Sequence, residues 1–108
     1  FGYAPDYVRA MWLMLQQDSP DDFLICTGTS VTLRDLVEHV FRKVGAPLDA
    51  IHIDQSLYRP NDIPDIYGDP HRAESGLGWK SRHNAFETMD LIVDETVEMA
   101  KAGQVSPL

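Results

Sequence analysis

The sequence has a single cysteine and no long apolar run, and both absences limit the class of protein to which it can belong. Cys26 cannot form an internal disulfide, and it lies in the apolar run FLIC, so we expect a buried thiol in a chain that works in the reducing cytoplasm. No stretch approaches the roughly 20 apolar residues of a membrane-spanning helix, and no charged leader precedes an apolar core at the N-terminus. We therefore expect no membrane partner.

Basic residues are scarce as well. Lys and Arg number 9 against 17 Asp and Glu, which gives a formal net charge of −8. A surface of this sign repels nucleic acid and anionic lipid, so neither is an expected partner. The hydrophobic fraction of 44 % and the charged fraction of 24 % are typical of a globular chain. The 108 residues form one domain at most, and they open on Phe1 rather than Met, as we expect of a piece of a longer protein.

Motifs for metal binding and for hydrolysis are also missing. Zinc needs three or four convergent ligands, but only His52 and Asp54 fall together on one face of a predicted strand. The other histidines, His39, His71 and His83, match no ligand spacing. No Ser-His-Asp arrangement can be argued from the order of the residues alone. We therefore expect no metal site and no hydrolase.

Apolar spacing and end signals predict four helices. They are expected over residues 5–18, from a capping box at Thr32 and Asp35 to Gly45, from an Asp69 N-cap and Pro70 to Leu77, and from Asn84 and Glu87 to Gly103.

Two short runs resemble strands, namely residues 23–28 and residues 50–54. In the second run Ile51 and Ile53 alternate with polar residues, as in a half-exposed strand. The predicted fold class is therefore α+β, a helix-rich small lobe with two or three short strands. The lobe is expected to span residues 1–103, and residues 104–108 are expected to be a frayed tail.

The helix expected over residues 5–18 has unusual apolar bulk. Its core-facing stripe is predicted at spacings i, i+3, i+4 and i+7, and Leu13 and Met14 widen the apolar surface past one face. A surplus of this kind favours self-association, so we expect a homo-oligomer through helix 5–18. The four residues of the predicted stripe are Val8, Met11, Trp12 and Leu15.

The segment YRPNDIPDIYGDPHRAESGLGW, residues 58–79, carries the candidate binding site. Arg59 can grip a phosphate with two parallel hydrogen bonds, and Asp62 can accept from sugar hydroxyls. Pro60 and Pro64 fix the backbone of the loop, which lowers the ordering cost of binding. The segment therefore favours a site for a nucleoside diphosphate.

Other roles remain open for residues of this segment. Arg59 could instead pair on the surface with Asp62 or Asp65, a contact worth little in water. Tyr58 could line the pocket or cover its base, and Asn61 could line the pocket or serve only as a turn residue. Trp79 ends a helix at Leu-Gly-Trp, and we interpret it as a core residue rather than a base-stacking one.

This segment, together with FGYAPDYVRAMWLMLQQ and DDFLICTG, resembles the distal part of extended short-chain dehydrogenases/reductases that act on nucleotide sugars. The opening is similar to GDP-mannose 4,6-dehydratase. RPNDIPDIYGD is closer to GDP-4-keto-6-deoxymannose reductase, since the dehydratase usually has Glu where Asp62 stands. The resemblance implies a C-terminal substrate-binding lobe in which Arg59 and Asp62 hold the diphosphate and the ribose of a nucleotide sugar, a GDP-hexose. It also implies NADP as the cofactor of the full-length parent, and a parent helix 5–18 packed between two lobes.

The parts of such an enzyme that carry out the chemistry are absent from the sequence. No Gly-rich turn follows a strand to seat a dinucleotide, and none of the four tyrosines is followed by Lys four residues later. No catalytic or cofactor-binding residue is therefore assigned. We expect the nucleotide-sugar binding portion of a dehydratase-like lyase, without its Rossmann domain and inactive alone. The alternatives are a reductase-like fragment and a free-standing, non-catalytic binding or oligomerisation module. The base, the hexose and the size of the oligomer stay open.

Overall fold

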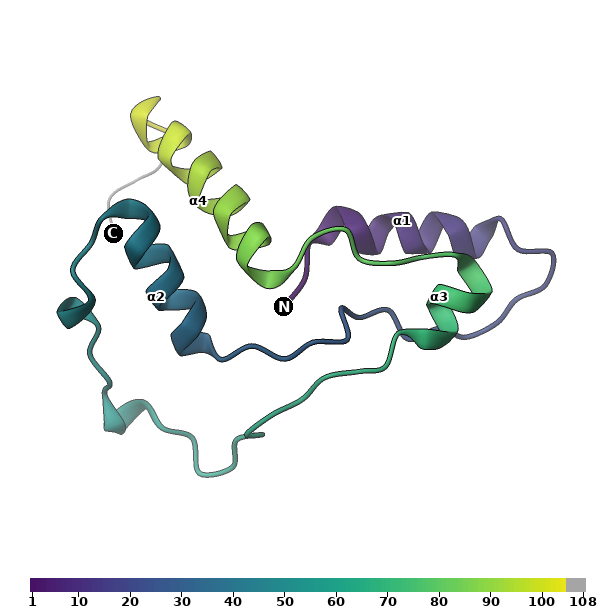
Figure 1. The fold of residues 1–108 in the computed structure, drawn as a ribbon, viewed down its shortest axis with the longest axis horizontal. Coiled ribbons are helices and arrows are strands. Elements are labelled where there is room, and N and C mark those ends of the chain that lie inside the picture. Colours follow the sequence, from purple (N-terminus) through teal and green to yellow (C-terminus); the bar gives the residue numbers. More distant parts are fainter. Residues whose placement is uncertain (105–108) are drawn as a thin grey trace.

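The computed structural model describes residues 1–104 and contains helices joined by long irregular segments (Figure 1). No strand occurs among these residues, so the predicted α+β class is wrong: the regular secondary structure of the described chain is helical only. The predicted frayed tail, 104–108, lies outside the described residues except for Gln104. The elements are α1 (Ala4–Leu15), α2 (Leu33–Val44), the short 3-10 helices η1 (Leu48–Ala50) and η2 (Gln55–Leu57), α3 (His71–Leu77) and α4 (Ala85–Lys101).

The two predicted strands fail for lack of a hydrogen-bonded neighbour. Residues 24–26 do run beside Gly68, because a side-chain carbon built on Gly68 would lie 2.8 Å from Leu24 Cδ2 and 2.9 Å from Cys26 Sγ. Within residues 1–104, however, no backbone hydrogen bond joins these segments, and a strand is stabilised by such a ladder. Residues 51–54 lie between η1 and η2 with Ile53 exposed. Cys26, expected to be buried, is half-buried.

The predicted helix ends are largely confirmed. The Thr32 hydroxyl caps α2 by accepting from the Asp35 amide at 3.1 Å, and Gly45 ends α2 with a φ of 72°. Asn84 and Glu87 form a full capping box at α4, with distances of 2.9 and 3.0 Å. These side chains satisfy backbone groups that a helix terminus leaves unpaired. Three boundaries shift by a few residues: α1 stops at Leu15, α3 starts at His71, and α4 stops at Lys101.

The helices pack as two pairs, α1 with α3 and α2 with α4 (Figure 1). Trp79 is fully buried at the first pair, against Ala10, Ala73 and Leu77. The small side chains of the two alanines leave room for the indole beside both helices. The core role predicted for Trp79 is confirmed.

The face that α1 turns to this core is the reverse of the predicted one. Leu13 and Met14, expected as surplus, are half-buried and pack against the Trp79 cluster beside Ala10. The predicted core stripe lies on the outside. The reason is steric: the small side chain of Ala10 lets this side of α1 approach Trp79 closely. When apolar residues surround most of a helix, the sequence pattern does not identify the side that the rest of the fold will cover.

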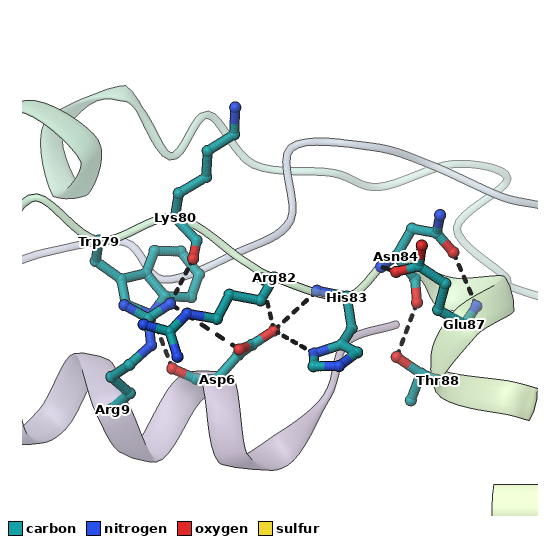
Figure 2. A network of polar contacts seen from close by, with 9 residues as sticks. All are labelled: Asp6, Arg9, Trp79, Lys80, Arg82, His83, Asn84, Glu87 and Thr88. Carbon is teal, nitrogen blue, oxygen red and sulfur yellow. Dashed lines mark hydrogen bonds and ion pairs between the residues drawn. The ribbon is translucent and has the colours of Figure 1, made fainter. Parts of the chain in front are cut away.

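A buried carboxylate joins α1 to residues 79–83 (Figure 2). Asp6 Oδ2 accepts from the Arg82 amide at 2.9 Å and from the His83 amide at 3.2 Å. The Trp79 indole donates to the Asp6 carbonyl at 2.7 Å, and an Arg9 guanidinium nitrogen donates to the Lys80 carbonyl. Burial by itself raises the pKa of Asp6, but the hydrogen bonds from Arg82 and His83 outweigh it and hold that pKa below its ordinary value. The ionised Asp6 side chain therefore links α1 to the backbone of residues 82 and 83.

The described chain is extended rather than compact. The radius of gyration is 17.7 Å, against about 13 Å for a compact domain of this length. In Figure 1 the segment between α2 and α3 swings away from both pairs along the lower edge of the view. Residues 52–67 of this segment are exposed throughout. This outlying segment carries the candidate site.

Candidate functional site

Three of the four predicted site residues line one open hollow. Tyr58, Arg59 and Asp62 surround it together with Leu57, and its volume is about 580 Å³. Asn61, predicted as a possible lining residue, does not line it. The loop thus brings a guanidinium, a carboxylate and an aromatic ring to the same small space.

The entrance to this loop is held by η2. The Asp54 carboxylate accepts from the Ser56 amide at 2.9 Å and from its hydroxyl at 2.7 Å. These bonds from Ser56, the one from its hydroxyl first, lower the pKa of the Asp54 carboxyl below its ordinary value. The turn delivers Tyr58 and Arg59 directly after the last residue of η2, Leu57.

The Arg59 guanidinium makes no hydrogen bond or ion pair with any residue in 1–104. The alternative surface pairing of Arg59 with Asp62 or Asp65 is absent, and the contacts of both carboxylates within the described residues go elsewhere. Asp62 Oδ1 accepts from the Ile63 amide at 3.0 Å, and Asp65 accepts from the Ser30 hydroxyl. The guanidinium fork of Arg59 is therefore open to an anion.

The contact between Ser30 and Asp65 ties the loop back to the start of α2. Sequence reasoning missed this pair, because 35 residues separate its members and nothing in the local pattern signals the contact. Beside it lies a second hollow of about 880 Å³ between residues 29–33 and 63–66, with Phe1 and Phe86 at its edge. Its charged lining residues are Asp35 and Asp65, so it suits hydroxyl groups and repels phosphate.

The described residues do not fit a dinucleotide or a metal. Gly76 lies inside α3 and Gly78 ends it in the left-handed conformation, so neither sits in a turn that leads from a strand into a helix N-terminus. Within residues 1–104 no group of three His, Cys, Asp or Glu side chains converges as metal ligands would. His39 instead lies 2.8 Å from Asp90 across the α2–α4 pair.

A comparison with known protein families identifies the family to which the chain belongs. The sequence profile of the family described as GDP-mannose 4,6 dehydratase matches residues 1–92. The chain belongs to this family. The match takes in α1, the loop of residues 58–67 (the Arg59 loop) and the first half of α4, so the resemblance found from the sequence is confirmed.

Curated members of the GDP-mannose 4,6 dehydratase family align along nearly the whole chain. It is 39 % identical to GDP-mannose 4,6 dehydratase 1 of Arabidopsis thaliana over 106 residues, which are 97 % of the chain and 29 % of that protein. It is 34 % identical to GDP-mannose 4,6 dehydratase of Homo sapiens over 119 aligned positions, with coverages of 94 % and 32 %. The chain thus spans about a third of the length of these relatives. Their names favour the dehydratase over the reductase alternative.

No helix within residues 1–104 of this dehydratase-family chain is long and apolar enough to cross a membrane. The cytoplasmic setting expected from the single cysteine stays a prediction.

Proposed function

We propose that this chain is the nucleotide-sugar binding portion of a GDP-mannose 4,6-dehydratase-like protein, and that the Arg59 loop binds the nucleotide part of the ligand. The observation that carries the proposal is the shared hollow of Tyr58, Arg59 and Asp62, in which Arg59 has no partner among the described residues. The relatives are named for a GDP-sugar, which supports a GDP-hexose as the ligand.

The two charged side chains divide the work by their chemistry. The planar guanidinium of Arg59 can donate two parallel hydrogen bonds to a diphosphate, which a chain of net charge −8 would otherwise repel. Asp62 uses Oδ1 for the Ile63 amide, and its second oxygen is left to accept from ribose hydroxyls. Tyr58 offers a ring beside both groups.

The proposed role of this chain is to bind a nucleotide sugar without catalysing a reaction. Its sequence contains neither the Gly-rich turn nor the Tyr and Lys pair that the enzyme family implied by the resemblance uses. Contacts to the non-reacting nucleotide can still position a hexose for groups supplied elsewhere. The chain alone is therefore proposed to be inactive.

Titration calorimetry with GDP, GDP-mannose, UDP-glucose and dTDP-glucose tests the proposal. Arg59→Ala should weaken all four ligands alike, by about 1.5 to 3 kcal/mol, since a phosphate contact carries no information about the base. Arg59→Lys should recover part of the loss, because an ammonium cannot reproduce the fork. The control is Arg42→Ala, which removes the same charge from an exposed position on α2. Equal affinities in the wild type and both Arg59 variants would remove Arg59 from the site.

A free-standing binding or oligomerisation module is the second candidate, favoured by the absence of the cofactor turn from these 108 residues. The gene that encodes the chain discriminates between the two. A Gly-rich strand-to-helix turn and a Tyr-x-x-x-Lys encoded upstream in the same reading frame would rule out the module. A gene without them would rule out the enzyme portion.

A further inference from the structure

The short helix η2, which leads into the Arg59 loop, has no apolar packing to hold its shape. None of its residues is buried, and the last of them, Leu57, is 77 % exposed. The whole surrounding segment, residues 52–67, is exposed as well. An exposed turn keeps one conformation only where its own polar bonds offset the entropy of the free chain. The shape of η2 therefore depends on its hydrogen bonds.

Most of these hydrogen bonds end on Asp54. Its carboxylate accepts from the Ser56 amide at 2.9 Å and from the Ser56 hydroxyl at 2.7 Å, and its backbone carbonyl accepts from the Leu57 amide at 3.2 Å. The remaining bond of the turn runs from the Tyr58 amide to the Gln55 carbonyl, also at 3.2 Å. Within residues 1–104 the carboxylate makes no hydrogen bond or ion pair except those with Ser56. Its contacts thus serve this turn alone.

We propose that Asp54 is a positioning residue for Arg59, and that its carboxylate fixes η2 so that the guanidinium is aimed into the hollow it shares with Tyr58 and Asp62. Tyr58 ends η2, Arg59 is the next residue, and Pro60 follows. A proline confines the residue before it to extended conformations, so the turn upstream decides where the Arg59 side chain points. A turn without its cap samples more conformations and raises the ordering cost of binding. This inference rests on the proposed binding of a diphosphate by Arg59.

The sign of the effect separates positioning from charge. Asp54 is an anion beside a site proposed for an anion, so removal of its charge alone should strengthen the binding of a diphosphate. Loss of the cap should weaken the binding instead. Asp49 in η1 supplies the matched control, because it is an exposed acid without a hydrogen bond or ion pair of its side chain in residues 1–104. Asp49→Ala therefore reports the effect of the charge by itself.

Titration of the 108-residue chain with GDP tests the inference. Asp54→Ala should weaken GDP about fivefold, the equivalent of one lost cap, whereas Asp49→Ala should bind as tightly as the wild type or more tightly. Asp54→Asn should stay within about twofold of the wild type, because Asn caps a turn as well as Asp does. The urea midpoints of all four proteins should agree, since both acids are exposed.

A double-mutant cycle shows whether Asp54 acts through Arg59. In an Arg59→Ala background, Asp54→Ala should have no further effect on the affinity for GDP. The same loss in both backgrounds would assign Asp54 a general structural role and overturn the inference. Unchanged or tighter binding in Asp54→Ala would overturn it as well. Equal affinities in the wild type and Arg59→Ala would instead refute the proposed binding by Arg59, and a wild type that does not bind GDP would refute both.

Discussion

Replacing Asp6 by alanine should release residues 82 and 83 from α1. Asp6 is only 4 % exposed, and its carboxylate accepts from two backbone amides, which have no other acceptor within the described chain. The indole bond of Trp79 goes to the Asp6 carbonyl and survives the substitution. The change therefore isolates the contribution of the side chain.

The expected loss is about 3 kcal/mol in the free energy of unfolding. A hydrogen bond to a charged acceptor contributes roughly 1.5 to 3 kcal/mol. Two such bonds from backbone amides are lost, together with the longer 3.4 Å contact of His83 Nδ1, but both amides are only partly buried and can recover some of the energy from water. Asp6→Asn keeps an acceptor oxygen without the charge, so its loss should be about half as large.

The effect should depend on pH in a defined direction. The pKa of Asp6 is lower in the folded chain than in the unfolded chain. Its contribution is therefore complete above the unfolded pKa, about 4, and disappears as the pH falls through the lower folded value. The difference in stability between the wild type and Asp6→Ala should be constant near neutral pH and should shrink below about pH 4.

Urea unfolding followed by circular dichroism measures these differences. Asp18→Ala is the control, because Asp18 is exposed and has no hydrogen bond or ion pair to the rest of residues 1–104. Amide hydrogen exchange adds a local reading, since the amides of Arg82 and His83 should lose protection in Asp6→Ala. Equal urea midpoints for Asp6→Ala and Asp18→Ala at neutral pH would refute the reasoning.

Three further outcomes follow from the sequence and the structure. The 108-residue chain with GDP-mannose and NADP should give no turnover above a protein-free blank, and turnover in a preparation free of host enzymes would contradict the proposed inactivity. Asn84→Ala should lower the free energy of unfolding by about 1 kcal/mol because it removes the cap of α4, whereas Asn61→Ala, in an exposed loop, should leave the urea midpoint unchanged. Trp79→Ala should cost about 3 to 5 kcal/mol and abolish the near-ultraviolet signal of the α1–α3 pair, and a retained urea midpoint would show that this cluster is not the core.

Local features of this chain were predictable from its sequence, because their causes lie within a few residues. Asn84 and Glu87 are three residues apart and cap α4 as expected, and the left-handed Gly45 ends α2 as expected. The clustering of Arg59 with Asp62 follows in the same way from a short turn. In each case the partner groups are neighbours in the sequence.

Features that depend on distant partners were not predictable. Residues 23–28 have the composition of a strand, but no described segment supplies the ladder. The orientation of α1 depends on where Trp79 lies, and the Asp6 contacts cross more than 70 positions of the sequence. Periodicity describes the faces of a helix, whereas the rest of the fold selects the face that is buried.

The pairing of the helices should hold the molecule together even when its chain is cut. Each pair joins a helix before the exposed segment 52–67 to a helix after it, α1 to α3 and α2 to α4. A protease that cuts at the Arg59 loop would break the covalent connection but neither packing contact. The two pieces should then stay associated, and peptides made separately as residues 1–59 and 60–108 should complement each other and recover the helical signal when mixed.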